Sequence, residues 1–497
     1  HNNKMPNKIR LNQDCWAEVL SFTNTRRRIS LTVLSKEFKT TVKKSYTGQY
    51  ADFREKNITD PMLAYVSTAS AVILSGSKII TDAGLQHLKN VKMVMLANCH
   101  KITDEGLKHL SNAETVNLSD CKNITNDGLR YLKNATTIDL ECMFGTSCGF
   151  TDDGLRHLSH VKEISLSNSF DITDNGLAHL KNATVIKLSN IIGITDDGLA
   201  HLTNIERINL EGCNGITDDG LRHLKNATKV NLAECNNITD DGLRHLKNTT
   251  ILKLCNCEDI TDDGLRHLSH VKDINLQGCD NITNDGLRHL KNATTINLSG
   301  CHNITDDGLV HLANVETVKL RFCDITDDGL RHLKNAIRVN LSDCYEITDD
   351  GLAYLTHVTT INLTHCFDIT DDGMHYLANA TMVNLSGCKN ITDNGLRYLS
   401  HVKNINLGYC DNITNDGLRH LTNATVANLQ SCDNISDDGL RHLTRVERIN
   451  LSGCKNITND GLRNLKNASI IRLARCPNIT NEGLRHLTNS TTIYTII

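Results

Sequence analysis

A repeat of about 22 residues runs through most of this chain and constrains its fold more than any other feature. Each repeat contains a Gly-Leu pair or a close variant of it, and nearly all pairs lie 22 residues apart. Two spacings differ: 26 residues separate Gly128 from Gly154, and 21 residues separate Gly308 from Gly329. A regular repeat of this length is typical of a solenoid, so a chain of 497 residues need not contain several globular domains.

One repeat, from Asn292 to Leu312, shows the local physics. Alternation of Ile296 and Leu298 with polar residues predicts a half-buried strand. Thr305, followed by two aspartates, predicts the N-cap and first turn of a short helix. Two leucines three residues apart give that helix a single apolar stripe.

A strand and about two helical turns cannot bury their apolar side chains alone, so the repeats must stack. Stacking predicts an α/β solenoid whose strands form a parallel sheet. The residues that we expect to be buried by stacking in the repeat just described and the next are Ile304, Leu309, Leu312, Val318, Leu320 and Cys323.

The cysteines follow the same repeat. Fifteen of the 19 cysteines occupy one repeat position: Cys99, Cys121, Cys213, Cys235, Cys257, Cys279, Cys301, Cys323, Cys344, Cys366, Cys388, Cys410, Cys432, Cys454 and Cys476. A free cysteine behaves as a small apolar residue, so this column predicts packing. The polar first ten residues show no signal peptide, and thiols then predict a cytoplasmic or nuclear protein. For Cys142 and Cys148, outside the column, a disulfide and two thiols both remain open.

Composition and motifs argue against several classes of function. The 53 Lys and Arg against 57 Asp and Glu give no basic excess for nucleic acid, and no apolar run is long enough to span a membrane. Phosphate-binding, nucleophile-elbow and zinc-protease motifs are absent, and the cysteines lack zinc-site spacing. Paired aspartates occur in almost every repeat and are therefore part of the scaffold. We expect no enzyme activity, no cofactor and no metal.

The pattern Leu-x-Leu-x-x-Cys-x-x-Ile-Thr-Asp-x-Gly-Leu-x-x-Leu, nearly complete from Leu298 to Leu312, resembles the cysteine-containing class of leucine-rich repeats. The resemblance covers residues 57–497, about 20 repeats. It implies a curved solenoid with the parallel sheet on the concave face and short helices on the convex face. It also implies a protein-recognition scaffold with its target protein on the concave face.

Residues 1–50 resemble an F-box and are expected to form a small helical segment. The resemblance rests on an apolar helix start at Leu11 and a later Val-Leu-Ser-Lys-Glu-Phe stretch, with Asn12 and Leu34 in place of the usual Pro and Val. It implies a substrate receptor of an SCF-type (cullin–RING) ubiquitin ligase. The residues expected to bind a Skp-type adaptor are Leu11, Trp16, Val19, Leu20 and Phe22. The alternative is a helical cap on a stand-alone leucine-rich-repeat scaffold.

Candidate partner-binding residues are departures from the repeat consensus on the concave strands. One outward strand position is Asn in eleven repeats, for which we favour an amide ladder along the sheet. The same position holds Lys187, Lys253, Lys319 and Arg472 in other repeats. Further candidates on this face are Glu141, Arg321, Phe322, His365, Tyr409 and Arg475. Exposed aromatic and Arg residues dominate interface energies, whereas neutral drift is the alternative explanation.

The 26-residue spacing contains an insertion directly after a strand, from Cys142 to Phe150. Insertions in solenoids form loops on one face, often the binding face. We therefore include Met143 and Phe144 among the partner-binding candidates. The alternative is a loop that fills a small pocket of its own.

Overall fold

The computed structural model describes residues 48–54, 58–487 and 492–494, which fall into two units of stacked repeats. Unit 1 ends at Asn237 and unit 2 begins at Ile238. The predicted F-box-like segment, with Leu11, Trp16, Val19, Leu20 and Phe22, lies outside the described residues.

Each repeat contributes one strand of three residues, and successive strands within a unit pair in parallel and in register. Unit 1 contains β1 Tyr50–Asp52, β2 Ala71–Ile73, β3 Met93–Met95, β4 Thr115–Asn117, β5 Thr137–Asp139, β6 Glu163–Ser165, β7 Val185–Lys187, β8 Arg207–Asn209 and β9 Lys229–Asn231. Unit 2 contains β10 Ile251–Lys253, β11 Asp273–Asn275, β12 Thr295–Asn297, β13 Thr317–Lys319, β14 Arg338–Asn340, β15 Thr360–Asn362, β16 Met382–Asn384, β17 Asn404–Asn406, β18 Val426–Asn428, β19 Arg448–Asn450, β20 Ile470–Arg472 and β21 Thr492–Tyr494. The predicted parallel sheet is confirmed in both units.

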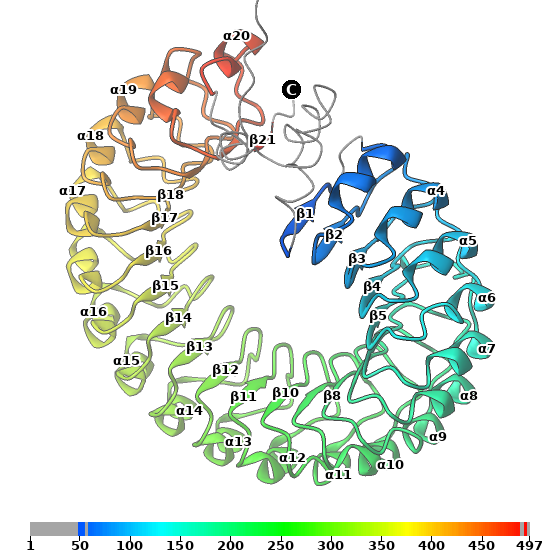
Figure 1. The fold of residues 1–497 in the computed structure, drawn as a ribbon. Helices are drawn as coiled ribbons and strands as arrows, with labels where there is room; N and C mark the ends of the chain where they lie inside the picture. Colours follow the sequence, from blue (N-terminus) through cyan, green and yellow to red (C-terminus); the bar gives the residue numbers. More distant parts are fainter. Residues whose placement is uncertain (1–47, 55–57, 488–491, 495–497) are drawn as a thin grey trace, which may run out of the picture. The chain divides into compact units, whose positions relative to one another are not determined.

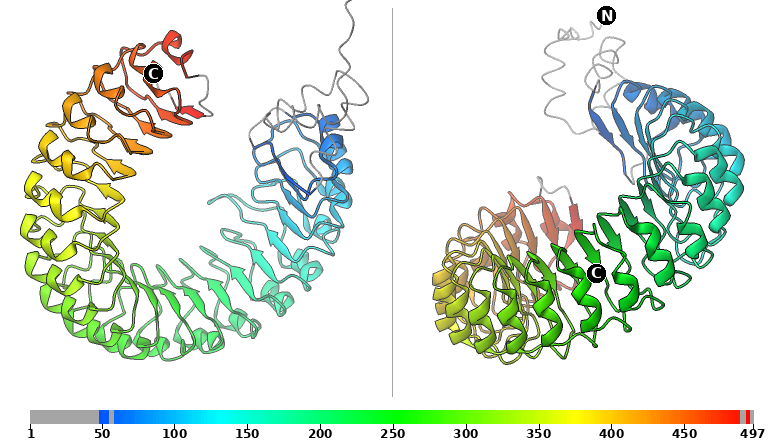
Figure 2. Two further views of the ribbon diagram at one scale, coloured as in Figure 1. Left: turned by 60° about the vertical axis from the view of Figure 1, so that its left-hand side comes forward. Right: turned by 90° about the horizontal axis from the view of Figure 1, so that it is seen from below.

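Short helices follow the strands and lie on the opposite, outer side of each unit (Figures 1 and 2). The α-helices of unit 1 are α4 Asp82–Leu85, α5 Asp104–Leu107, α6 Asn126–Leu129, α7 Asp152–Leu155, α8 Asp174–Leu177, α9 Asp196–Leu199 and α10 Asp218–Leu221. Those of unit 2 are α11 Asp240–Leu243, α12 Asp262–Leu265, α13 Asn284–Leu287, α14 Asp306–Leu309, α15 Asp327–Leu330, α16 Asp349–Leu352, α17 Asp393–Leu396, α18 Asn415–Leu418, α19 Asp437–Leu440 and α20 Asn481–Leu484. The concave strands and convex helices expected from the leucine-rich-repeat resemblance are confirmed within each unit.

Turns of 3₁₀-helix extend or replace these helices. Those that extend an α-helix are η3 Gln86–Leu88, η4 Lys108–Leu110, η5 Arg156–Leu158, η6 Ala178–Leu180, η7 Arg222–Leu224, η8 Arg266–Leu268, η9 Arg288–Leu290, η10 Val310–Leu312, η11 Arg331–Leu333, η12 Ala353–Leu355 and η14 Arg397–Leu399. Those that stand in place of an α-helix are η2 Asp60–Val66, η13 Asp371–Leu377 and η15 Gly461–Leu465. The convex side of each repeat thus consists of short helical turns, which fits a repeat of only 22 residues.

The core lies between the strands and the helices of each unit. All six residues predicted to be buried by stacking are buried, and none exposes more than 4% of its surface: Ile304, Leu309, Leu312, Val318, Leu320 and Cys323. Burial of one such aliphatic side chain stabilises the fold by about 2 kcal/mol. Because the same positions are buried in repeat after repeat, stacking supplies the core that no single repeat has.

A ladder of aspartate and threonine joins the helix starts of successive repeats. The Asp306 carboxylate accepts hydrogen bonds from the backbone N–H (2.9 Å) and hydroxyl (2.6 Å) of Thr326 in the next repeat. The Thr326 hydroxyl in turn caps α15 by accepting from Asp328 N–H. A Cβ at Gly329 would lie 2.3 Å from Asp306 Oδ1. The Gly of the repeated Gly-Leu pair therefore makes room for this ladder.

The cysteine column is a second ladder. The Cys323 thiol donates to the carbonyl of Leu298 in the preceding repeat at 3.0 Å, and Cys301 donates to Leu276 in the same way. Burial raises the pKa of Cys121 to about 12 and that of Cys213 to about 11. The fifteen predicted column cysteines are thiols, and all of them are buried. Burial keeps these thiols protonated and unreactive, so they pack rather than react.

The predicted amide ladder along the strands is wrong. Each of the eleven asparagines instead accepts a hydrogen bond from the backbone N–H two residues on, as Asn340 does from Ser342 at 3.0 Å. The same contact recurs for Asn362 and Asn384. This local bond competes with bonds between the asparagine side chains of neighbouring strands. The asparagine oxygens therefore bond within their own repeat and not to one another along the sheet.

Candidate functional site

The outward residues of the strands in unit 2 form a surface with a charge imbalance. We call this surface the strand face of unit 2, defined as the first and third residues of β10 to β20. Its charged residues are Lys253, Asp273, Lys319, Arg338, Arg448 and Arg472. Five of these six residues are basic, and none of the five cations forms an ion pair within the described residues of unit 2. All five are exposed, so this face offers positive charge without an internal partner.

The outward strand residues of unit 1 are balanced in charge. Acidic Asp52, Asp139 and Glu163 occur together with the basic residues Lys187, Arg207 and Lys229. Two of these charges already neutralise each other, because Arg207 and Glu163 form an ion pair of 3.0 Å. The predicted candidate Glu141 lies nearby, where burial and the charge of Asp139 raise the pKa of its carboxyl group. The strand faces of the two units therefore differ in the partners that they suit.

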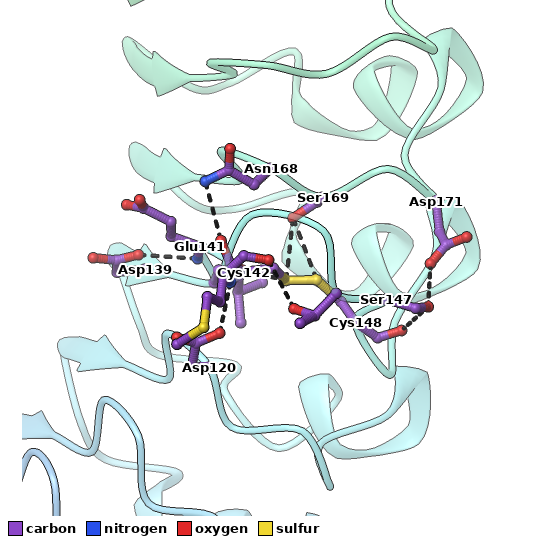
Figure 3. Close-up of a disulfide and its surroundings, with 12 residues drawn as sticks. Asp120, Asp139, Glu141, Cys142, Ser147, Cys148, Asn168, Ser169 and Asp171 are labelled. Carbon is purple, nitrogen blue, oxygen red and sulfur yellow. Dashed lines mark hydrogen bonds between the residues drawn. A yellow bond between two sulfur atoms is a disulfide. The ribbon is translucent and has the colours of Figure 1, made fainter.

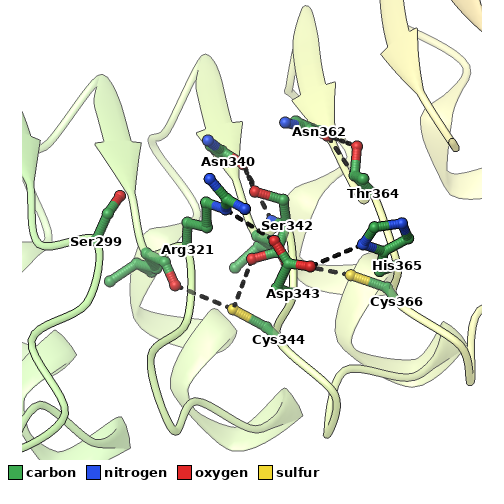
Figure 4. A network of polar contacts seen from close by, with 12 residues as sticks. Ser299, Arg321, Asn340, Ser342, Asp343, Cys344, Asn362, Thr364, His365 and Cys366 are labelled. Carbon is green, nitrogen blue, oxygen red and sulfur yellow. Dashed lines mark hydrogen bonds and ion pairs between the residues drawn. The ribbon is translucent and has the colours of Figure 1, made fainter. Parts of the chain in front are cut away.

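A buried carboxylate organises the loops that follow β13, β14 and β15 (Figure 4). Asp343, only 6% exposed, accepts from Arg321 Nε at 2.8 Å and lies 2.8 Å from Nδ1 of His365. Burial raises the pKa of the Asp343 carboxyl group, but the hydrogen bonds from Arg321 and His365 outweigh this and lower it overall. The charged carboxylate thus holds two side chains from neighbouring repeats in place.

Three aromatic side chains surround this network. Phe322 lies beneath the Arg321 guanidinium, with 4.4 Å between the guanidinium carbon and the ring centroid. Tyr345 and Phe367, from the next two repeats, stack with 5.9 Å between centroids, and His365 lies 6.0 Å from Phe367. All three aromatic residues are exposed. We call Arg321, Phe322, Tyr345, His365 and Phe367 the aromatic rim.

Several candidates occupy one backbone position with positive φ, directly before the cysteine column. The candidates at this position are Phe322 (φ 58°), His365 (φ 58°), Tyr409 (φ 61°) and Arg475 (φ 56°). Aromatic residues with positive φ are uncommon and strained, so the fold retains these side chains at an energetic cost. The same position also has positive φ in other repeats, where Gly, Asn, Asp, Glu or Ser occupies it, so the backbone conformation belongs to the repeat and only the side chains are unusual.

Gly387 leaves room for the imidazole ring of His365. Gly387 occupies the same backbone position in the next repeat, and a Cβ there would lie 2.3 Å from Cδ2 of the His365 ring. The ring therefore lies over a residue that must have no side chain. Tyr409, one repeat further, is exposed and accepts a hydrogen bond from the Gln430 amide. His365 is thus positioned by Asp343 from one side and by Gly387 from the other.

The insertion in unit 1 is closed by a disulfide between Cys142 and Cys148 (Figure 3). The backbone N–H of Met143 donates to Asp120 at 2.6 Å, and the Ser147 hydroxyl donates to Asp171 at 2.8 Å. These bonds tie the loop to the repeat before it and the repeat after it. The sequence left open whether the two cysteines are paired, because pairing depends on how the loop folds back.

The insertion loop presents an apolar surface. Met143 is 53% and Phe144 is 73% exposed, and Phe144 packs edge-on against Phe170 with 6.0 Å between centroids. Ile192, in the next repeat, is 78% exposed. Phe150, at the end of the insertion, is buried in the core. The first half of the loop therefore projects outward, while its second half returns to the regular repeat.

The structure places the predicted residues in distinct groups. Lys187, Lys253, Lys319 and Arg472 end their strands and point outward, as predicted. Arg321, Phe322 and His365 meet in the aromatic rim. Glu141, Met143 and Phe144 belong to unit 1 and are separate from that rim. Tyr409 and Arg475 follow β17 and β20 in unit 2.

Sequence reasoning missed Asp343, Tyr345 and Phe367. Tyr345 and Phe367 directly follow the cysteine column, where most repeats have a polar residue, and Phe170 and Ile192 occupy the same place in unit 1. Comparison of the position after the cysteine from repeat to repeat would have found all four apolar residues. The shortened spacing was a further signal, because the missing residue lies beside Cys323, next to the aromatic rim.

Metal and membrane features are absent from the part of the chain that the structure describes. No group of three or more His, Cys, Asp or Glu side chains in residues 48–54, 58–487 and 492–494 is arranged to hold a metal ion. Within the same residues, no helix combines the length and the apolar character that crossing a bilayer requires.

Comparison with known proteins supports the fold. A family model described as Leucine Rich repeat matches residues 201–225, 267–291, 294–313, 311–333, 354–378 and 381–400. Comparison with curated protein sequences gave no match.

Two solved structures are similar. One is a TLR13–ssRNA13 complex, with a TM-score of 0.57 and 15% identity over 88% of this chain and 76% of that chain. The other is the Toll–Spatzle complex of Drosophila, with a TM-score of 0.47 and 14% identity over 89% of this chain and 62% of that chain. At this identity the first likeness concerns the fold alone. The chain thus contains leucine-rich repeats, and its fold is a leucine-rich-repeat solenoid.

Proposed function

We propose that the chain is a protein-recognition scaffold and serves as the substrate receptor of an SCF-type ubiquitin ligase. The observation that carries the recognition part is the strand face of unit 2, where five exposed cations lack ion-pair partners among the described residues. The aromatic rim adds preorganised aromatic and Arg side chains beside that face. Such residues carry most of the binding energy in protein interfaces.

The ligase part rests on the F-box resemblance of residues 1–50. In this proposal Leu11, Trp16, Val19, Leu20 and Phe22 bind a Skp-type adaptor through their apolar side chains. The repeats hold the target protein, which raises its effective concentration near a ubiquitin-conjugating enzyme bound to the same ligase. The chain itself then needs no catalytic group.

A second candidate is a stand-alone recognition scaffold with a helical N-terminal cap. The resemblance of residues 1–50 to an F-box is incomplete at Asn12 and Leu34, which favours this alternative. Recognition by the repeats is common to both candidates. They differ only in whether residues 1–50 bind an adaptor.

Titration of the full chain with a purified Skp-type adaptor separates the two candidates. We expect saturable binding that a Trp16→Ala, Leu20→Ala variant loses and that an Arg448→Ala control retains. Circular dichroism shows whether each variant is folded. No binding at tens of micromolar adaptor to the folded chain would contradict the ligase proposal and leave the stand-alone scaffold.

A further inference from the structure

A hollow of about 340 Å³ lies on the strand face of unit 2, over β17 to β20. Its lining includes Val426, Asn428, Arg448, Asn450, Ile470 and Arg472. Ligand pockets in proteins run from about 300 to 1,000 Å³, so this hollow has room for one or two side chains of a partner.

The register of the strands orders this lining into two rows. Val426, Arg448 and Ile470 are direct neighbours on β18, β19 and β20. Adjacent strands lie about 4.8 Å apart, so the Arg448 side chain rises between two aliphatic side chains. Arg448 is exposed, so its charge is accessible to an anion that enters from solvent.

The second row contains amides and an arginine. Asn428, Asn450 and Arg472 are neighbours on the same three strands. The Oδ1 of Asn428 accepts from the Gln430 backbone, which leaves its Nδ2 as a donor without a partner among the described residues. The Arg472 guanidinium lies 5.5 Å from the Tyr494 ring centroid, a contact that restricts its orientation.

The charge of the hollow is positive. Its lining contains two arginines and no acidic residue, and neither arginine forms an ion pair within residues 238–487 and 492–494. A surface that has several hydrogen-bond donors and no carboxylate suits an anion. The apolar residues beside Arg448 suit an aliphatic side chain adjacent to that anion.

We propose that this hollow binds a carboxylate side chain of an extended acidic segment in the partner protein. Arg448 and Arg472 bind the carboxylate, and Val426 and Ile470 contact an apolar side chain that neighbours it. This assignment rests on the proposed function as a recognition scaffold and names the chemistry of the partner. The two arginines are exposed, so their substitution leaves the core intact.

Selection from a library of random twelve-residue peptides on the immobilised full chain tests the assignment. We expect the selected peptides to contain Asp or Glu beside an aliphatic residue. Selection on an Arg448→Glu, Arg472→Glu variant should lose this enrichment. The matched control is Lys389→Glu, Lys403→Glu, which makes the same charge change at exposed residues of unit 2 outside the strand face and the hollow and should keep it.

Fluorescence anisotropy of the most enriched peptide then measures affinity. We expect at least tenfold weaker binding to the Arg448→Glu, Arg472→Glu variant, at most twofold weaker binding to the control, and at least tenfold loss when Glu in the peptide becomes Gln. Tighter binding after replacement of that Glu by phosphoserine would overturn the carboxylate assignment. Equal loss in both protein variants would also overturn it, because the charge would then act diffusely.

Selected peptides without acidic residues, or no selected peptides, contradict the inference as well. The proposed ligase function is judged separately by the adaptor titration, which does not involve Arg448 or Arg472. Failure of the inference and failure of the proposed function are therefore distinguishable.

Discussion

The insertion loop of unit 1 and the aromatic rim of unit 2 depart from the repeat at equivalent places, yet different forces hold them. Both lie directly after a strand, and both coincide with an irregular repeat spacing. A disulfide between Cys142 and Cys148 closes the loop, whereas the buried carboxylate of Asp343 holds the rim. The disulfide is covalent, so its presence depends on redox conditions. The contacts of Asp343 are ionic, so their strength depends on pH.

The difference teaches how a uniform solenoid gains local surfaces. The ladders of Asp, Thr and Cys recur in most repeats and join each of these to its neighbour in the same way. The loops after the strands contain the column cysteines, but the residues directly before and after each cysteine differ from repeat to repeat. A few substitutions there change the exposed surface without disturbing the core.

Removal of the disulfide is the largest expected effect. A Cys142→Ser, Cys148→Ser variant should lose about 2 kcal/mol of stability in unit 1, because the closed loop no longer restricts the unfolded chain. Hydrogen–deuterium exchange analysed region by region measures this loss. A reducing agent should cause the same loss of stability in the parent chain and should leave the exchange of the variant unchanged. Faster exchange in the aromatic rim and not in unit 1 would contradict a local role of the disulfide.

Removal of the Asp343 carboxylate has the next largest expected effect on stability. Asp343→Asn should cost about 1 kcal/mol, since Arg321 and His365 lose a charged acceptor but remain partly in water. The pKa of Asp343 is lowered by folding, so its contribution is present above the unfolded pKa of about 3.9. It should disappear as pH falls through the lower folded pKa.

Denaturant titrations at a series of pH values check this pH dependence. Asp120→Asn is the matched control in unit 1, because an Asn there still accepts from the backbone of Met143. An equal cost for both substitutions would show that the charge of Asp343 has no special role.

Comparison of two glycine substitutions tests the contact between Gly387 and the His365 ring. Gly387→Ala and Gly300→Ala both place an alanine at positive φ, near 74° and 73°, and should both destabilise the protein. Only Gly387→Ala also displaces the His365 ring, since a Cβ at Gly300 would lie 3.9 Å from its nearest neighbouring atom. We expect Gly387→Ala to cost about 0.5 kcal/mol more. Equal unfolding free energies would contradict the contact.

Substitution of exposed apolar residues has the smallest expected effect on stability. Ile192→Ser in unit 1 and Met382→Ser on the strand face of unit 2 should each change the unfolding free energy by less than about 0.5 kcal/mol. Thermal denaturation measures both variants side by side. A larger loss in either would mean that the residue supports the fold rather than a surface.

The fold was predictable because its determinants repeat. The alternation around Ile296 and the spacing of Leu309 and Leu312 recur many times, so the strand, the helix and the core follow from one repeat. The reason for the repeated glycine was not predictable, because the contact of Gly329 is with Asp306 in another repeat. Periodicity identifies which positions matter but not which atoms meet.

The candidate site was only partly predictable. Arg321, Phe322 and His365 differ from the consensus and were found, but Asp343 resembles the many other aspartates of the chain. Its role depends on burial between two neighbours, which no single repeat reveals. The asparagine ladder was wrong because the side chain of Asn340 bonds to its own chain. Local bonds of this kind compete with the longer-range ones that a column of identical residues suggests.

The central claim is that an acidic segment binds the strand face of unit 2 through Arg448 and Arg472 and that this binding does not need the disulfide of the insertion loop in unit 1. The most direct measurement is the affinity of the selected peptide for the full chain under three conditions: untreated, reduced, and with Arg448→Glu, Arg472→Glu. We predict unchanged affinity after reduction of the Cys142–Cys148 disulfide and at least tenfold loss in the variant. Loss of affinity on reduction, with full binding retained by the variant, would contradict the claim.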